Sequence, residues 1–377
     1  MHKPLKVLQF ICPTGFYGAE RWILTLAKNL DDAVVQCDLA VTVEPGMAEL
    51  EVARQYQALG KKVHRVPMQG RFDLGGISRL CALIRAEGYD IIHTHGYKSD
   101  ILGLIAARLT GIKIVATPHG FENAEDWKLR AYIGLGNQFL KWCDVVAPLS
   151  EQLCEDVAKI GVRSQKVRYV QNGVDLDEVD GQRRNAASNA VLQSKTLKRV
   201  GFIGQMISRK NIFDLLDIFD GLQQKHGNLE LKLLGDGDQR KELEQYTQKL
   251  ASRPAIEFLG FRNDRLEWLQ SFDLFVMTST LEGIPRCLME TMAMGVPVAA
   301  YAIPGIDQLV IHDKTGVLAP LGEKQALAEQ WERLLFEPDL SRRIVDNARD
   351  FVWNHFSGAR MAKEYTDLFR DMVGNTR

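Results

Sequence analysis

The sequence has little net charge and no long apolar run. The formal net charge of the 377 residues is −1, whereas nucleic-acid-binding domains usually carry a basic surface. The apolar run "ILGLIAA", which begins at Ile101, is far shorter than the roughly 18 residues that indicate a membrane span. These absences argue against nucleic-acid binding and against a membrane-spanning chain.

Paired cysteines are also lacking. The six cysteines are scattered without a CxxC motif, so neither a disulfide framework nor a cysteine zinc site is expected. The opening "MHKPLKVLQFIC" turns polar at Pro13 after a short apolar stretch, which is not typical of a signal peptide. We therefore expect a cytoplasmic protein. A slight excess of basic residues in the N-terminal part is compatible with peripheral contact at the inner face of the membrane.

What the chain does contain is an alternation of strand-like and helix-like segments. Apolar runs such as "LKVLQFI", "DIIHTH" and "DLFVMTS" are separated by segments with helical spacing such as "AERWILTLAKNL". This order is typical of parallel sheets covered on both faces by helices. The pattern breaks at the turn pair Asn172-Gly173 and restarts near residue 197. We predict an α/β protein with two doubly wound Rossmann-like domains facing across a cleft, over residues 1–172 and 173–355, with a linker around 171–196.

Ligands of doubly wound domains usually bind at the carboxyl ends of the strands. Several glycines and polar residues follow predicted strands in this sequence. We expect them to line the cleft; they include Gly18 in "TGFYGAE", His119 in "TPHG", Arg209 and Lys210 in "GQMISRKN", and Phe261 and Arg262 in "FLGFRND".

Two glutamates lie on either side of a Gly-Ile-Pro step in "TLEGIPRCLMETMAMGVPV". A helix is expected to begin near Pro285, and its free N–H groups and dipole suit a diphosphate. Lys210 would add a positive charge to the same phosphates. Glu282 then lies where a sugar on the diphosphate would sit, and Glu290 lies where a ribose would offer two hydroxyl donors to a carboxylate. The pattern therefore predicts a sugar-nucleotide site.

This pair of glutamates, followed by "AMGVPVAA", resembles the E-x7-E signature of glycosyltransferase family 4. Further similar segments extend over nearly the whole chain, among them "TGFYGAE", "TPHG", "VQNGVD", "LLGDGD" and "GIDQLVIHDKTGVLAP". The resemblance implies the GT-B fold and a retaining transfer of a sugar from a nucleotide donor to a hydroxyl acceptor. It also implies an acceptor-side first domain, a donor-binding second domain, and a last helix at 356–377 that crosses back to the first domain.

The resemblance also implies roles for individual residues. Glu282, His119 and Lys210 would act on the transferred sugar and the phosphates. The donor-binding residues would be Glu290, Gly18, Gln205, Arg209, Gly283, Ile284, Phe261 and Arg262. One departure concerns the Gly-Arg pair that is common in the family, because this chain has Gly204-Gln205. Two alternatives stay open: Gln205 or Arg209 serves the phosphate in place of the missing arginine, or Arg209 simply faces solvent.

No cofactor and no metal ion are expected. The two Asp-x-Asp pairs, at Asp175 and Asp236, have simpler explanations in turn and helix-cap chemistry. His93 and His95 share one face of a strand end, but no third metal ligand stands out.

The donor is expected to be a UDP- or GDP-sugar, and the acceptor a hydroxyl group, for example on a lipid-linked glycan. Assembly of cell-envelope polysaccharide or lipopolysaccharide is the setting that the resemblance suggests. Two alternatives remain open: a nucleotide-sugar epimerase or hydrolase of the same fold, and a non-enzymatic nucleotide-sugar sensor. An epimerase would need acid–base carboxylates in the first domain, for which Glu20, Asp100 and Glu122 are candidates.

Overall fold

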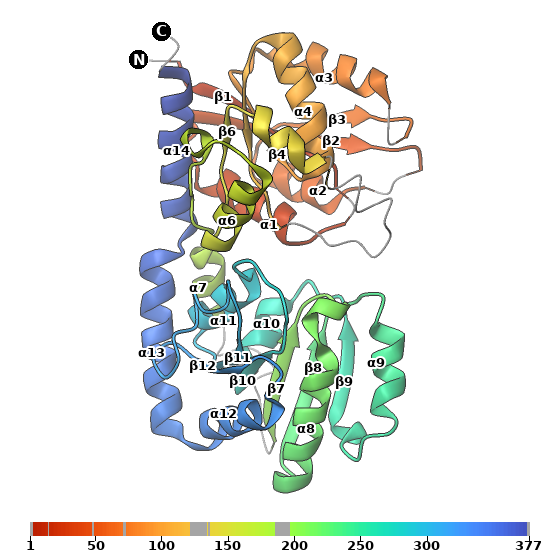
Figure 1. Cartoon of the computed structure of the whole chain (residues 1–377), viewed down its shortest axis with the longest axis vertical. Coiled ribbons are helices and arrows are strands. Elements are labelled where there is room, and N and C mark those ends of the chain that lie inside the picture. The colour runs from red at the N-terminus through yellow and green to blue at the C-terminus, as the bar shows by residue number, and fades with distance from the viewer. Residues whose placement is uncertain are drawn as a thin grey trace. The chain divides into compact units, whose positions relative to one another are not determined.

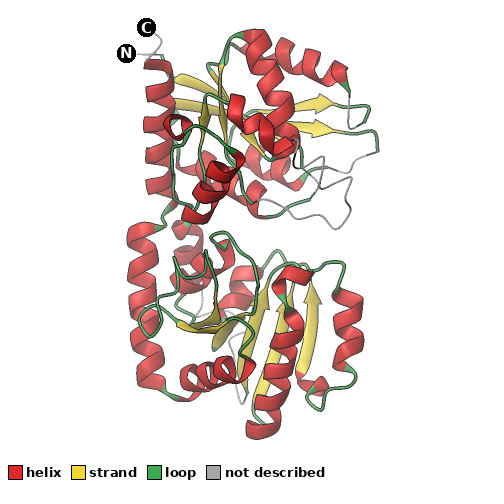
Figure 2. Cartoon of the chain, in the orientation of Figure 1, coloured by secondary structure: helices red, strands yellow, loops and turns green. Residues whose placement is uncertain are grey.

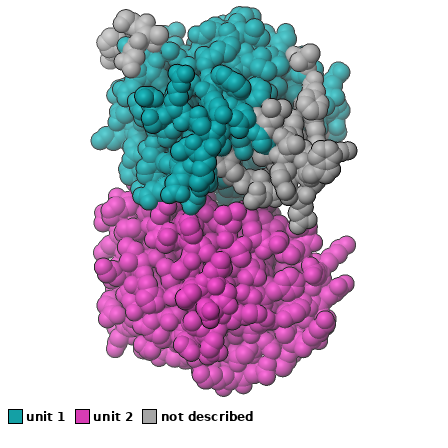
Figure 3. Space-filling model, in the orientation of Figure 1, with its two compact units in different colours: residues 1–173, 358–377 teal, residues 174–357 magenta. Residues whose placement is uncertain are grey.

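The structure is a computed structural model that describes residues 3–13, 15–46, 49–70, 73–120, 134, 136–184 and 197–374. The chain forms two compact units, shown in different colours in Figure 3. Unit 1 contains residues 1–173 and 358–377, and unit 2 contains residues 174–357.

Unit 1 is built on a sheet of six parallel strands in the order β3-β2-β1-β4-β5-β6 (Figure 1). This is the strand order of a doubly wound dinucleotide-binding domain. The strands are β1 (Leu5–Ile11), β2 (Val35–Val43), β3 (Val63–Pro67), β4 (Ile91–His95), β5 (Lys113–Ala116) and β6 (Val145–Val146).

Helices cover both faces of this sheet, and each face has its own apolar cluster. The helices are α1 (Gly18–Asn29), α2 (Glu51–Ala58), α3 (Leu74–Glu87), α4 (Tyr97–Thr110), η1 (Phe139–Trp142), α6 (Glu151–Ile160), η2 (Ser164–Lys166) and α14 (Gly358–Gly374). The first cluster contains residues of α1, α2 and α14, and the second contains residues of α3 and α4.

Local sequence explains where several of these helices begin and end. The carboxylate of Asp73 accepts a hydrogen bond of 2.8 Å from the amide of Gly75 at the start of α3. The hydroxyl of Ser150 caps α6 in the same way through the amide of Leu153. Such caps satisfy amides that have no partner within the helix. α3 ends at Glu87, and the C-cap residue that follows, Gly88, has a φ of 67° that favours glycine.

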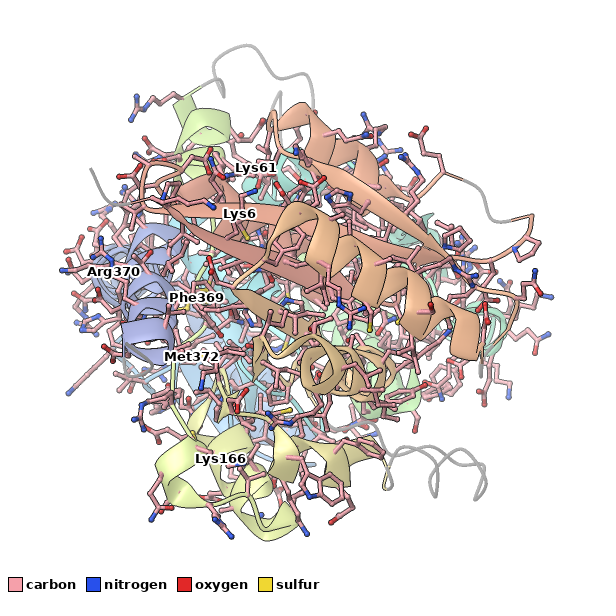
Figure 4. The ribbon with its side chains drawn as sticks, turned by 90° about the horizontal axis from the view of Figure 1, so that it is seen from above. Lys6, Lys61, Lys166, Phe369, Arg370 and Met372 are labelled. Carbon is pink, nitrogen blue, oxygen red and sulfur yellow. The ribbon has the colours of Figure 1, made fainter. Side chains whose placement is uncertain are left out.

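The last helix, α14, belongs to unit 1 and packs against α1. Met361, Tyr365, Phe369 and Met372 are buried and recur every three or four residues, which places them on one side of the helix. Figure 4 shows Phe369 and Met372 toward the sheet, with Arg370 on the outer side. Chain segments far apart in the sequence therefore share one apolar cluster.

Unit 2 has a second sheet of six parallel strands, in the order β12-β11-β10-β7-β8-β9. Figure 2 draws the strands in yellow and the helices in red. The fold-class prediction of two doubly wound α/β sheets is therefore confirmed. The strands are β7 (Lys198–Ile203), β8 (Leu229–Leu234), β9 (Ile256–Gly260), β10 (Leu274–Met277), β11 (Val298–Ala302) and β12 (Val317–Pro320).

A single apolar cluster forms the core of unit 2. The helices of unit 2 are α7 (Leu176–Arg184), η5 (Ser208–Lys210), α8 (Ile212–His226), α9 (Arg240–Thr247), η6 (Arg253–Ala255), α10 (Arg265–Gln270), α11 (Arg286–Met294), α12 (Lys324–Phe336) and α13 (Pro338–His355). The prediction of a linker at 171–196 is wrong for α7, because Leu176 and Val179 of this helix are buried in the core. The remainder of that stretch, 185–196, lies outside the described residues.

Candidate functional site

The loop between β10 and α11 carries the first glutamate of the predicted site. As the sequence predicts, the helix begins just after Pro285, which is its N-cap residue. Glu282 lies in the loop before it and is only 6% exposed. A Cβ atom built on Gly305, in the loop after β11, would lie 1.9 Å from the carbonyl oxygen of Gly283. Only a glycine at position 305 therefore allows the two loops to pack so closely. This packing supports the loop that holds Glu282.

Glu282 pairs with both cations of the "SRKN" segment. The ammonium group of the buried Lys210 donates to its Oε1, and a guanidinium nitrogen of Arg209 lies 3.4 Å from its Oε2. The loops are also joined through the backbone, because the amide of Thr280 donates to the carbonyl of Arg209 at 2.8 Å. Two positive charges against one carboxylate leave a net positive charge in this cluster, close to the start of α11.

The second glutamate, Glu290, lies within α11 and is 3% exposed. Its carboxylate accepts two hydrogen bonds from Arg265, at 2.9 and 3.2 Å, and one from Arg286 at 2.8 Å. Arg265 also reaches Glu178 of α7 at 3.2 Å. Burial disfavours the charge on Arg265, but the two carboxylates still hold its pKa above the usual range. The carboxylate predicted to bind ribose is thus also the centre of a buried ion-pair network.

The neighbouring loops of unit 2 place the remaining predicted donor-binding residues. Gln205 follows β7 and is half-buried. The glycines of "LLGDGD" have a packing role, since a Cβ atom on Gly235 would lie 1.8 Å from the carbonyl oxygen of Gly204. Phe261 follows β9 and is 55% exposed. Arg262 pairs with Asp264 through its Nε at 2.7 Å, and this contact lowers the pKa of Asp264.

In unit 1, Gly18 is the first residue of α1. A Cβ atom at Gly18 would meet no heavy atom of the described residues within 4 Å, so packing does not require glycine there. Glu20 accepts a hydrogen bond of 2.8 Å from the amide of Tyr17 and therefore caps α1. Asp100 accepts a hydrogen bond of 2.6 Å from Thr94, and burial raises its pKa to about 7. Glu122, the third candidate for acid–base chemistry, lies outside the described residues.

His119 follows β5 and lies beside the two histidines of β4. Its Nε2 is 3.0 Å from Nδ1 of His95, and His93 packs on His95 with ring centroids 4.4 Å apart. Burial lowers the pKa of His119 to about 3 and holds the pKa values of His93 and His95 well below their usual range. All three imidazoles are therefore neutral at pH 7. In the described part of the chain, no group of three or more metal-ligating side chains is placed to hold an ion.

Several contacts of these sites were not predicted from the sequence. Arg286 precedes Glu290 by four residues, a helical spacing that sequence inspection can detect. Arg265 comes from another helix, and no local pattern connects it to Glu290. His119 contacts His95, which in turn contacts Gln9, and Trp22 packs against His119. These residues come together only through the sheet and α1.

Comparison with known proteins gives two family models that match adjacent parts of the chain. "Glycosyltransferase Family 4" matches residues 16–178, and "Glycosyl transferases group 1" matches residues 184–351. The curated relatives include UDP-Gal:alpha-D-GlcNAc-diphosphoundecaprenol alpha-1,3-galactosyltransferase of Escherichia coli, which is 29% identical over 322 residues, covering 80% of this chain and 81% of that enzyme. N-acetyl-alpha-D-glucosaminyl L-malate synthase of Bacillus anthracis is 25% identical and covers 80% of each chain.

Solved structures are similar over almost the full length. HepE of Anabaena, in a complex with UDP-glucose, has a TM-score of 0.82 at 21% identity, covering 97% of this chain and all of that chain. Sucrose-phosphate synthase of Thermosynechococcus elongatus has a TM-score of 0.79 at 19% identity, covering 98% and 100%. These similarities establish the GT-B fold. Among the described residues, no helix combines the length and the apolar character of a membrane span.

Proposed function

Since the chain belongs to glycosyltransferase family 4, we propose that it transfers a sugar from a UDP- or GDP-sugar to a hydroxyl group of a cell-envelope glycan, with retention of the anomeric configuration. The acceptor is a lipid-linked glycan presented at the inner face of the membrane. Support comes from the E. coli relative, whose name specifies a UDP-sugar donor and a diphosphoundecaprenol-linked acceptor, and from the HepE complex with UDP-glucose.

The observation that carries this proposal is the cluster of Lys210, Arg209 and Glu282 close to the start of α11. Its net positive charge adds to the partial positive charge of the helix N-terminus. A diphosphate is a ligand with matching charge. Binding it would draw the cations toward the phosphates, so that Glu282 exchanges part of its ion pairing for hydroxyl groups of the sugar.

In the reaction, the bond between the anomeric carbon and the diphosphate oxygen breaks, and the acceptor oxygen forms a bond to that carbon. The acceptor proton passes to the departing diphosphate or to solvent. Lys210 and Arg209 stabilise the charge that grows on the leaving group, which is where fixed electrostatic groups accelerate a reaction most. Gln205 and the amides of Gly283 and Ile284 hold the donor by hydrogen bonds.

The remaining roles follow the same scheme. Glu290 binds the ribose hydroxyls, since a carboxylate only accepts hydrogen bonds and a ribose offers two hydroxyl donors. The exposed ring of Phe261 stacks on the base, and Arg262 lies beside it. Gly18 approaches the phosphates, and His119 contacts the transferred sugar. No metal ion takes part.

Thermal-shift measurements with UDP, GDP and a panel of their sugars test the proposal. A ligand at 100 times its dissociation constant stabilises the protein by about 2.7 kcal/mol. We expect one nucleotide family to stabilise the wild type clearly, and Lys210→Ala to lose most of that shift. If no nucleotide shifts the wild type at millimolar concentration, the proposal is wrong. Hydrolysis or epimerisation of a bound donor without transfer would favour an epimerase or hydrolase, and binding without any product would favour a sensor.

A further inference from the structure

The histidine cluster of unit 1 contains a directed chain of hydrogen bonds. Trp22 of α1 packs against His95 and His119, with ring centroids 5.3 Å from each. Nδ1 of His95 lies 3.0 Å from Nε2 of His119, and Nε2 of His95 lies 2.6 Å from Oε1 of Gln9. The amide nitrogen of Gln9 donates in turn to the sulfur of Cys37 at 3.3 Å. Gln9, His95 and Cys37 are all buried.

The directions of these bonds determine where the protons lie. The amide oxygen of Gln9 can only accept, so Nε2 of His95 must carry a proton. Because His95 is neutral, its Nδ1 has no proton and acts as an acceptor. Nε2 of His119 must therefore carry the proton that it donates to His95. A neutral His119 with its proton on Nε2 has a free lone pair on Nδ1.

His93 does not compete for these positions, because it belongs to a separate chain of bonds. Its Nε2 lies 2.7 Å from the hydroxyl of Thr117, which is 2.9 Å from the hydroxyl of Tyr365 on α14. No described residue forms a hydrogen bond with Nδ1 of His119, and this residue is partly exposed. The Nδ1 lone pair is thus available to a ligand.

We propose that Gln9 and His95 are positioning residues that hold His119 in the Nε2–H tautomer, so that its Nδ1 accepts a hydrogen bond from a hydroxyl group of the sugar substrate. The inference rests on the proposed function, because it places His119 at the sugar. The tautomer also predicts which sugars are bound. A sugar with a free hydroxyl at the contacted position is bound, whereas its deoxy or O-methyl analogue lacks the proton that Nδ1 requires and is discriminated against.

The tautomer can be measured without substrate and without activity. We would label the protein with ¹⁵N-histidine, assign His119 by comparison with His119→Asn, and record long-range ¹H–¹⁵N spectra at pH 7. The expected result is a protonated Nε2 and an unprotonated Nδ1. The reverse assignment in the wild type would overturn the proposal. This readout is independent of whether a nucleotide sugar is ever bound.

Gln9→Met tests the hydrogen bonds from Gln9 through His95 to His119, because methionine has a similar length but no strong acceptor for His95. We expect a mixture of His119 tautomers in this variant. Tyr365→Phe is the matched control, since it removes a buried hydroxyl of the same cluster from the other chain of bonds, and it should leave the His119 tautomer unchanged. A single unchanged tautomer in Gln9→Met would mean that Gln9 does not control His119.

The substrate contact is tested by comparing kcat/KM for sugar transfer in the same two variants. Loss of a neutral hydrogen bond corresponds to a change of about 2- to 10-fold. Gln9→Met should lower kcat/KM for the sugar transfer by that factor, with unchanged affinity for the bare nucleoside diphosphate, whereas Tyr365→Phe should retain wild-type kcat/KM. A mixed tautomer together with unchanged kcat/KM would refute the substrate contact. If the wild type binds no nucleotide sugar at all, the proposed function fails, and the tautomer result stands by itself.

Discussion

Replacing Glu290 by alanine should destabilise unit 2 strongly, because this carboxylate pairs with two arginines at a buried position. Its side chain is 4% exposed, and those of Arg265 and Arg286 are 10% and 13% exposed. Removing one partner of a buried ion pair costs about 3–5 kcal/mol, since the remaining charge loses its buried counter-charge. For a unit of this size, about 2–4 °C of melting temperature corresponds to each kcal/mol. We therefore expect a decrease of roughly 6–20 °C.

Glu178→Ala is the matched control. Glu178 contacts the same Arg265 at 3.2 Å, but its side chain is 42% exposed, and pairs of that kind contribute about 0–1 kcal/mol. Differential scanning calorimetry of the two variants, with the transition of unit 2 followed separately, gives the comparison. If Glu290→Ala is no less stable than Glu178→Ala, the buried network does not stabilise the unit and the reasoning is wrong.

The stability effect also determines how the ribose role of Glu290 must be tested. Calorimetric titration with nucleoside diphosphate should be performed well below the melting temperature of the variant, with circular dichroism confirming the folded state. A lost hydrogen bond to a charged group costs about 1.5–3 kcal/mol, so binding should weaken tenfold or more. Unchanged affinity in the folded variant would remove Glu290 from the nucleotide site and leave it only a structural role.

The other predictions concern the positive cluster, its supporting loop and metal dependence. Lys210→Ala should lower turnover by about 10²–10³ while the protein stays folded, and a nearly normal rate would exclude Lys210 from leaving-group stabilisation. Glu282→Ala should reduce turnover far more than affinity for the bare diphosphate; equal losses in kinetics and calorimetry would contradict its assignment to the sugar. Gly305→Ala should impair both stability and turnover, because its Cβ would clash with Gly283. Gly322→Ala should lose only stability, because Gly322 also has a positive φ but has no such neighbour. Similar turnover in the two variants would argue against the role of Gly305 in supporting the Glu282 loop. Activity should survive EDTA, and a loss that manganese or magnesium restores would refute metal independence.

The sequence predicts the elements of this fold well because their signals are local. Alternating apolar strands and amphipathic helices need only short-range patterns, and the start of α11 is marked by Pro285. α7 was not predicted because its segment is mostly polar, with only Leu176 and Val179 buried. A short helix with two buried apolar residues gives too weak a periodic signal to distinguish it from a linker.

Side-chain partnerships are predicted only where helical spacing brings residues together. The pair Arg286 and Glu290 is such a case, with its four-residue separation. Arg265 is 25 residues from Glu290, and Gln9 is 86 residues from His95. These contacts depend on which strands are neighbours and on how each helix packs. The sequence therefore predicted Glu290 and His119 as site residues but did not reveal the buried partners that hold them.

The most direct test of sugar transfer is a product analysis with purified protein. The protein would be incubated with UDP- and GDP-sugars together with a lipid-linked glycan acceptor, and the product analysed by mass spectrometry and by NMR of its anomeric proton. We expect an acceptor extended by one sugar, with the same anomeric configuration as the donor. An inverted linkage would contradict retention, and a donor that is hydrolysed, epimerised or left intact across the whole panel would contradict the proposed transfer itself.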